Sequence, residues 1–256
     1  MDSKTSNKIS METNTVIEGD CLEIMKEITD KSIDMILCDL PYGTTACKWD
    51  TIIPFEPLWE QYKRIIKDNG AIVLTASQPF TSALVMSNPK MFKYEWIWDK
   101  VKPSTFLNAK RQPLMKHESI VVFSDGKFPD YYPIKTKGRM RNKTPNRAEV
   151  KREQVYRNLD NKNIENVNDA YYPKSIIEVS NASQRGKLHP TQKPVALFEY
   201  LIKTYTNEGD LVLDNCAGSG TTGVACQNLK RNFILIEKEP EYVAIAENRL
   251  RQEPLI

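Results

Sequence analysis

The sequence has little of what membrane, secreted or metal-binding proteins need. Its 256 residues contain no apolar run of about 18 residues, so we expect no transmembrane helix. The polar N-terminus, MDSKTSNKISMETN, offers no signal-peptide core. The five cysteines form no CxxC pair and there are only two histidines, which argues against both a disulfide framework and a zinc site. We therefore expect a cytoplasmic protein with no membrane contact and no metal.

The composition is that of an ordinary globular protein, but its basic residues are unevenly distributed. Apolar residues make up 40% of the chain and charged residues 27%, while the net charge is only +3. Between residues 135 and 157, however, nine lysines and arginines face only two glutamates. Such a block indicates either a polyanionic partner or a solvated loop. The candidates for contacts with phosphates are Lys135, Lys137, Arg139, Arg141 and Lys143.

Short apolar runs alternate with helical patterns over most of the chain. The run IDMILC (33–38) is typical of a strand buried on both faces, and Asn69-Gly70 is expected to end the helix that follows it. This alternation predicts an α/β fold with an open, mostly parallel sheet. Residues 125–188 break the pattern with Tyr, Pro, Asn, Lys and Arg. We therefore expect a flexible N-terminus and two halves of one domain around an insertion, with the boundaries 1–14, 15–124, 125–188 and 189–256.

A glycine motif near the C-terminal end of the chain predicts a nucleotide site. Gly218, Gly220 and Gly223 form GxGxxG between an expected strand and helix, and Glu237 ends the next strand. Glycines allow a ligand to approach the start of the helix, and an acid at this place suits ribose hydroxyls. NAD and S-adenosylmethionine (AdoMet) both fit this pattern. Because only one helix can follow Glu237, the other strands must precede the motif, as in a circularly permuted fold.

A second motif, Asp39-Leu40-Pro41-Tyr42, follows the strand at 33–38. The carboxyl end of a parallel strand is where such folds bind ligands. Asp39 and the Leu40 carbonyl can accept hydrogen bonds from an amino group, Pro41 fixes the turn, and Tyr42 can stack on a planar base. The motif is either a clamp for an exocyclic amino group on an aromatic ring or a plain turn at the end of a strand.

The order of three motifs resembles that of the β-class DNA amino-methyltransferases. These AdoMet-dependent enzymes carry D/N/S-P-P-Y, then a variable insertion, then HPTQKP-like and glycine motifs; here Leu40 stands in place of the first proline. The similarity spans about residues 15–250 and includes HPTQKP at residues 189–194. It implies a circularly permuted, Rossmann-like methyltransferase fold with a mostly parallel seven-stranded sheet. Residues 15–124 would form its catalytic half, 125–188 its target-recognition insertion and 189–256 its AdoMet-binding half.

The resemblance also implies roles for individual residues. Asp39, Leu40, Pro41 and Tyr42 would hold the target amino group and its base. Glu237 would bind the ribose of AdoMet, and Asp20 would approach its adenine amino group or merely cap a helix. The methionine part of AdoMet would be bound by Asp214, Gly218, Gly220 and Thr221, with Lys193 near its carboxylate.

The function implied is site-specific transfer of a methyl group to N6 of adenine in double-stranded DNA, as in restriction–modification systems. Cytosine-N4 methylation is the alternative, although Asp39 favours adenine because the cytosine-N4 enzymes usually have serine there. Two readings from other classes are a nicotinamide-dependent oxidoreductase and a non-catalytic DNA-binding module. A homodimer is a further expectation from the resemblance.

Overall fold

The computed structural model describes residues 12–44, 47, 50–143, 166–181 and 192–251. The pattern of contacts within the chain divides it into two compact units. The main unit comprises Met1–Tyr132 and Ser175–Ile256, and the insert unit comprises Pro133–Lys174. Among the described helices, none has both the length and the apolar character that a membrane span requires.

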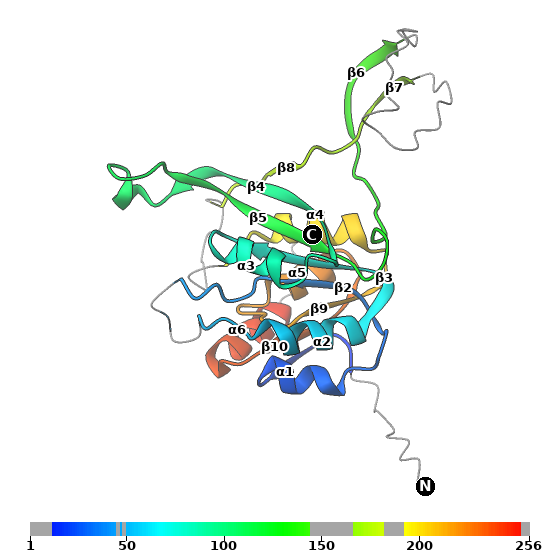
Figure 1. Ribbon diagram of the computed structural model, residues 1–256. Coiled ribbons are helices and arrows are strands. Elements are labelled where there is room, and N and C mark those ends of the chain that lie inside the picture. Colours follow the sequence, from blue (N-terminus) through cyan, green and yellow to red (C-terminus); the bar gives the residue numbers. More distant parts are fainter. Residues whose placement is uncertain (1–11, 45–46, 48–49, 144–165, 182–191, 252–256) are drawn as a thin grey trace. The chain divides into compact units, whose positions relative to one another are not determined.

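The main unit is built on a mixed sheet of eight strands in the order β1-β10-β9-β2-β3-β5-β4-β8 (Figure 1). Five of the pairings are parallel, whereas β5 runs antiparallel to both of its neighbours. The strands are β1 (Thr15–Glu18), β2 (Ile33–Cys38), β3 (Ile66–Ala76), β4 (Phe92–Ser104), β5 (Met115–Phe123), β8 (Ile176–Glu178), β9 (Leu211–Asp214) and β10 (Asn232–Glu237).

The sheet has one strand more than the seven expected from the sequence. The additional strand is β8, which pairs in parallel with the outer side of β4, so that Ile97 lies opposite Ile176. It has only three residues and its burial alternates, so it lacks the apolar run that marks the inner strands. Its place in the sheet comes from backbone pairing rather than from a side-chain pattern.

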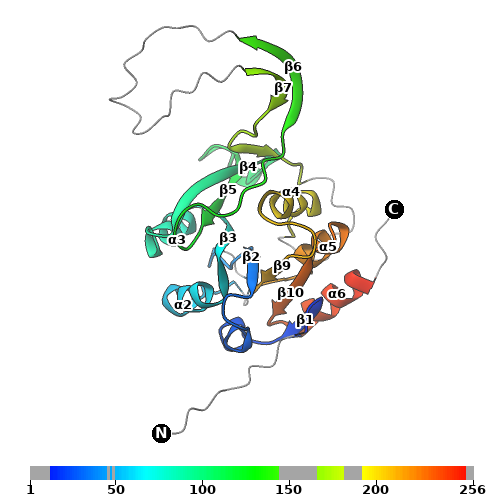
Figure 2. The ribbon, with the colours of Figure 1, turned by 90° about the vertical axis from the view of Figure 1, so that its right-hand side faces the viewer.

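Helices cover both faces of this sheet, which Figure 2 shows close to edge-on. One face carries α1 (Cys21–Ile24), the short 3-10 turn η1 (Met25–Glu27), α2 (Phe55–Ile65) and α3 (Phe80–Ser87). The other carries α4 (Val195–Tyr205), α5 (Thr221–Asn228) and α6 (Pro240–Arg251). Alternate residues of β2 enter the two cores: Ile36 and Cys38 pack on the first, and Met35 and Leu37 on the second. Burial on both faces explains why this strand is almost continuously apolar.

The expectation that Asn69-Gly70 ends a helix is wrong. Helix α2 stops at Ile65, and β3 begins at the next residue and runs through Asn69 and Gly70. The register of β2 against β3 shifts between Ile33 and Met35, so this Asn-Gly lies in an irregular stretch of the strand. A Cβ on Gly70 would lie 2.9 Å from the carbonyl oxygen of Asp34, a close approach that favours glycine here.

The N-terminal and C-terminal parts of the chain pair with each other in the sheet half that holds the glycine motif. Strands β9 and β10 come from the C-terminal part, and N-terminal β1 pairs in parallel with β10, with Val16 opposite Leu235. The start of the chain thus supplies the strand that would follow β10, which is consistent with the expected circular permutation. Parallel pairing also brings the carboxyl ends of β1, β2, β9 and β10 to one edge of the sheet.

The insert unit contains a two-stranded antiparallel ladder of β6 (Thr136–Lys143) and β7 (Asn166–Tyr171). The Tyr171 hydroxyl donates to the Arg139 carbonyl at 2.7 Å and its ring lies against Gly138, where a Cβ would come within 2.6 Å of the ring. Glycine at this position therefore permits the cross-strand contact.

Candidate active site

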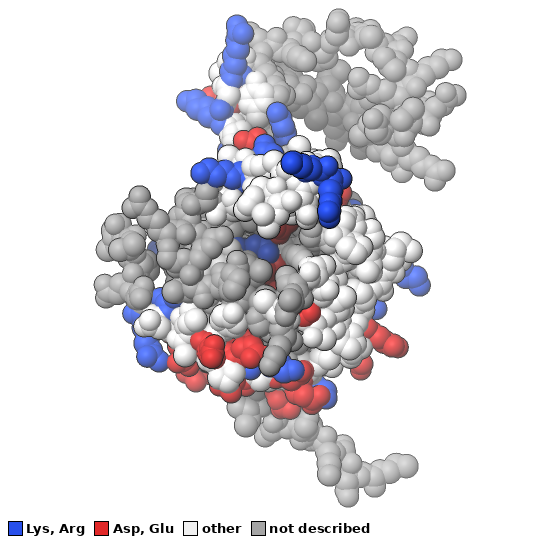
Figure 3. Space-filling view, turned by 90° about the vertical axis from the view of Figure 1, so that its left-hand side faces the viewer, with Lys and Arg blue, Asp and Glu red and all other residues white. Residues whose placement is uncertain are grey.

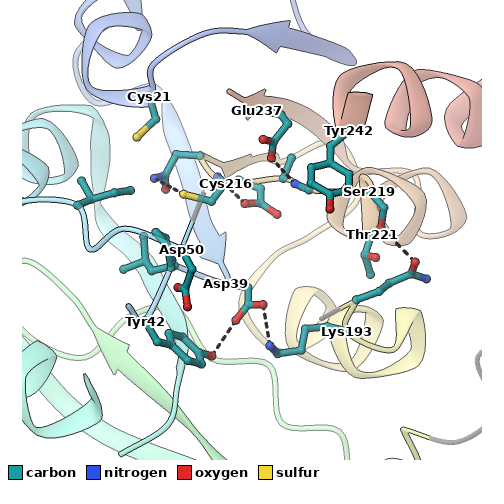
Figure 4. A pocket seen from close by; sticks show the side chains of 18 of the residues that line it. Cys21, Asp39, Tyr42, Asp50, Lys193, Cys216, Ser219, Thr221, Glu237 and Tyr242 are labelled. Carbon is teal, nitrogen blue, oxygen red and sulfur yellow. Dashed lines mark hydrogen bonds and ion pairs between the residues drawn. The ribbon is translucent and has the colours of Figure 1, made fainter. Parts of the chain in front are cut away.

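A cavity of about 620 Å³ lies where the parallel strands end, and both sequence motifs line it. Asp39–Tyr42 enter it from the end of β2, the glycine loop enters from the end of β9, and Glu237 enters from the end of β10. Figure 4 shows Asp39 between Tyr42 and Lys193, with Glu237, Ser219 and Thr221 grouped in another part of the pocket. The crevice outside the strand ends is the usual ligand site of open α/β sheets.

The glycine loop has the backbone that its sequence predicts. Gly218 and Gly220 have φ values of 50° and 76°, in the left-handed region that favours glycine. A Cβ on Gly220 would also lie 2.9 Å from the Cβ of Ala246 in α6. The guanidinium of Arg249, in the same helix, donates to the Ser219 carbonyl at 2.5 Å. The loop is therefore fixed between its own helix α5 and the last helix of the chain.

Two buried carboxylates flank this loop. Asp214 accepts the Cys216 backbone N–H at 3.1 Å and the Thr222 hydroxyl, and burial raises its pKa to about 6 although both hydrogen bonds oppose that shift. Glu237 accepts the backbone N–H of Gly218 at 2.7 Å and that of Glu239 at 2.9 Å. Glu237 thus joins the glycine loop to β10 while it lines the cavity.

Asp20 caps a helix, as one of the two sequence interpretations expects, and it also lines the cavity. It is the N-cap of α1 and accepts the backbone N–H of Leu22 at 2.9 Å. It also lines the cavity, and its second carboxylate oxygen lies 3.9 Å from the Lys238 ammonium. Capping uses only Oδ1 of Asp20, so Oδ2 has no partner among these contacts other than the distant Lys238 ammonium.

The Asp39 carboxylate is the most heavily bonded group at the other end of the cavity. Its Oδ1 accepts the Tyr42 hydroxyl at 2.7 Å and the Thr75 hydroxyl, and its Oδ2 accepts the Lys193 ammonium at 2.6 Å. Burial raises the pKa of Tyr42 well above its ordinary value, so its hydroxyl stays protonated and donates. The Tyr42 ring stacks on Phe80 with 5.1 Å between ring centres.

The other two residues of the motif support this arrangement. Leu40 is 3% exposed and packs into the first core, Pro41 is half-buried, and both residues line the cavity. Downstream, the buried Asp50 accepts the backbone N–H groups of Gly43 and Thr44 at 2.8 and 2.9 Å. Asp50 therefore fixes the loop after Tyr42, a role that no motif in the sequence indicated.

Lys193 bridges two carboxylates. Besides its 2.6 Å contact with Asp39, its ammonium lies 3.5 Å from Oε2 of Glu118, and Oε1 of Glu118 is 3.2 Å from the ammonium of Lys100. Burial alone would lower the pKa of Lys193, but the two carboxylates outweigh it, so the pKa is raised and the ammonium stays charged. The sequence suggested Lys193 but neither Glu118 nor Lys100, which lie in strands without any motif.

The HPTQKP segment is described from Gln192 onward; His189, Pro190 and Thr191 lie outside the described residues. The Gln192 side-chain oxygen accepts the hydroxyl of Ser219 at 3.2 Å, while Lys193 contacts Asp39. These adjacent residues therefore connect the glycine loop to the Asp39 motif. A cavity of this size, with carboxylates at one end and an acceptor beside an aromatic ring at the other, has the groups needed to hold both AdoMet and an aromatic amine.

The basic residues expected to contact DNA lie in the insert unit. Lys135, Lys137 and Arg139 are exposed; Lys135 lies over the Tyr172 ring at 4.5 Å, and Lys137 is 3.8 Å from Asp169. Arg141 and Lys143 continue the same strand β6, and the rest of the basic block, residues 144–157, lies outside the described residues. Among the described residues, no group of three or more His, Cys, Asp or Glu side chains could hold a metal ion.

Comparison with known proteins gives consistent matches. The sequence model of a DNA methylase family matches residues 33–248. The chain is 28% identical to type II methyltransferase M.HpaI of Haemophilus parainfluenzae, over 93% of this chain and 74% of that protein. It is 25% identical to type II methyltransferase M2.MboI of Moraxella bovis, over 93% of this chain and 87% of that protein.

Solved structures match along nearly the whole chain as well. The M1.HpyAVI–SAM complex superposes with a TM-score of 0.64 at 27% identity, covering 93% of this chain and 99% of that one. The cytosine-N4-specific PvuII DNA methyltransferase superposes with a TM-score of 0.68 over 97% of this chain and 90% of that one; at 16% identity this likeness concerns the fold.

Proposed function

This chain belongs to the DNA methylase family whose model spans residues 33–248, and on that premise we propose that it transfers a methyl group from AdoMet to N6 of adenine in double-stranded DNA. The family match supports AdoMet over NAD for the glycine motif and disfavours the oxidoreductase alternative. The observation that carries the proposal is the meeting of Asp39 with Lys193, 154 residues away, in the cavity that also holds the glycine loop.

The residues of the loop end fit AdoMet. We assign Asp214, Gly218 and Thr221, which line the cavity, to its methionine part, together with Gly220, whose left-handed backbone shapes the loop; Glu237, also in the lining, is assigned to its ribose. Asp20 approaches the adenine amino group in this assignment. When bound there, AdoMet supplies a methyl group on a positively charged sulfur. Lys193 lies with Asp39, so we assign it to the target side of the cavity rather than to the methionine carboxylate.

At the target end, Asp39 and the Leu40 carbonyl accept the two N–H groups of the adenine amino group. These bonds favour a pyramidal nitrogen whose lone pair is directed at the methyl group. AdoMet would supply the methyl group and leave as the neutral thioether S-adenosylhomocysteine, and we assign Asp39 as the acceptor of the proton that the methylated nitrogen would then lose. Tyr42 stacks on the base, which must leave the duplex to reach the cavity.

The insert unit supplies the contacts with DNA in this proposal. The exposed cations of β6 bind phosphates, which adds affinity without sequence preference, and base-edge contacts from residues 125–188 supply the sequence specificity. The homodimer and the cytoplasmic location stay predictions; light scattering of the purified protein checks the first, and fractionation of the producing cells the second.

The test is transfer of labelled methyl groups from AdoMet to unmethylated genomic DNA by the purified protein, followed by digestion to nucleosides. We expect the label in N6-methyl-2′-deoxyadenosine. Label in N4-methylcytosine would move the chain to the alternative specificity. DNA binding without any label transfer would favour the non-catalytic module.

A further inference from the structure

The β4–β5 hairpin ends in a tip that projects from the sheet (Figure 1). This tip exposes large apolar side chains. We define the hairpin tip as residues 101–116. Phe106 and Leu107 are 74% and 88% exposed, and Val101, Leu114 and Met115 are also exposed. Exposed apolar residues grouped in this way mark an interaction surface more often than isolated ones do.

The tip has a defined fold although no apolar core supports it. Thr105 adopts a left-handed φ of 65°, and its hydroxyl donates to the Ser104 carbonyl and accepts the Met115 N–H at 3.1 Å. The short 3-10 turn η2 (Phe106–Asn108) follows, and the Arg111 N–H closes a further turn on the Asn108 carbonyl at 2.8 Å. A left-handed threonine is strained, and such strain is concentrated at functional positions. These hydrogen bonds and turns therefore hold the backbone that presents Phe106 and Leu107 to solvent.

All charged residues of the tip are basic. Lys102, Lys110, Arg111 and Lys116 lie within it without a single Asp or Glu. Lys116 is neutralised by Asp99 at 2.8 Å, while the other three have exposed side chains. Figure 3 looks onto the side from which the hairpin projects: basic side chains lie at the level of the hairpin, and acidic ones gather toward the lower edge. An apolar point surrounded by cations complements duplex DNA, whose phosphates surround apolar base faces.

The tip begins at the rim of the cavity. Ser104 and Met115 are paired across the hairpin, and both line the cavity that holds Asp39. The Ser77 hydroxyl, on the strand side of the cavity, also contacts the Met115 sulfur at 3.8 Å. A duplex that places one nucleotide in the cavity would therefore meet the tip within a few residues of the flipped position.

We propose that Phe106 and Leu107 enter the duplex beside the target nucleotide and occupy the space that it leaves when it turns out. Lys102, Lys110 and Arg111 bind the flanking phosphates. This inference rests on the proposed function and adds a wedge that the motifs do not provide. Apolar side chains inserted between base steps are a known means of unstacking a duplex.

The test compares two duplexes that carry the methylation sequence determined for the wild-type protein. In one the target base is paired, and in the other it lies opposite an abasic site, so that it is already unpaired. For Phe106→Ser/Leu107→Ser we expect the single-turnover rate to fall by at least about tenfold on the paired duplex and to stay within about threefold on the unpaired one. The matched control Met86→Ser changes a 72% exposed side chain of α3 and should leave both rates unchanged.

Equal losses on both duplexes, or no loss on either, would overturn the wedge. A change of the variant from dimer to monomer in light scattering would instead assign the tip to a second copy of the chain and also overturn it. If the wild-type protein methylates neither duplex, the proposed function itself fails, so the two failures are distinguishable.

Discussion

Replacing Asp39 by alanine should abolish most of the methyl transfer, and the structure indicates how much stability is lost with it. The substitution removes the carboxylate that accepts Tyr42, Thr75 and Lys193. Loss of one preorganised transition-state partner costs about 100-fold or more in rate. AdoMet affinity should stay within about threefold, because the carboxylates and glycines at the other end of the cavity are untouched.

The stability change follows from Lys193, which is only 8% exposed and loses its shortest ionic contact. Removing one partner of a buried ion pair costs about 3 to 5 kcal/mol. Because Asp39 is itself 23% exposed and Glu118 remains 3.5 Å from the ammonium, we expect the low end, about 3 kcal/mol. Urea denaturation of wild type and Asp39→Ala measures this difference.

A double variant separates the two effects. Adding Lys193→Met to Asp39→Ala removes the unpaired buried ammonium, so most of the lost stability should return. Single-turnover transfer should remain at the level of Asp39→Ala, since the acceptor for the amino group is still absent. Near-normal transfer by Asp39→Ala, or recovery of transfer in the double variant, would refute the assignment of Asp39 as the acceptor.

Three further predictions concern the base, the cofactor and the DNA. Tyr42→Phe keeps the ring but loses the hydroxyl that donates to Asp39, so single-turnover transfer should fall by about tenfold, and Tyr42→Ala should lose far more; equal losses would argue against stacking. Asp214, with its pKa raised to about 6, becomes neutral as the pH falls from about 7.5 to 5 and no longer attracts the methionine ammonium, so calorimetry should show AdoMet affinity falling with pH in wild type but not in Asp214→Asn. Alanine at the exposed basic residues Lys135, just before β6, and Lys137 and Arg139 within it should weaken binding to all DNA sequences alike. It should also reduce the salt slope by about 0.9 for each lost phosphate contact.

Much of the fold could be predicted because strands buried on two faces must be apolar throughout. The run Ile33–Cys38 shows this, since its alternate residues pack into two different cores. Strand β8 could not be found in this way, because it has three residues held by backbone pairing to β4. The prediction that Asn69-Gly70 ends a helix failed because the pairing of strands in the sheet outweighs the local turn preference of these residues. The sheet accommodates them in an irregular stretch of β3.

The site was predictable where its chemistry is local in the sequence. The glycine loop and Asp39–Tyr42 lie within short segments whose spacing has a physical meaning. Glu118 lies in mid-strand between His117 and Ser119, and only the position of β5 in the sheet brings it to Lys193. Lys193 directly precedes the cap of α4 and Asp39 directly follows β2, so their pairing depends on how this helix and this strand pack, across 154 residues of sequence.

The most direct test of the central claim is methylation-aware sequencing of DNA from a methylation-deficient host that produces this protein. We predict N6-methyladenine at the occurrences of one short sequence in cells with the wild-type protein, and at none of them in cells with Asp39→Ala at equal protein levels. N4-methylcytosine in its place would contradict the assignment of the target base. DNA without any modified base, from cells that contain the folded wild-type protein, would contradict the account as a whole.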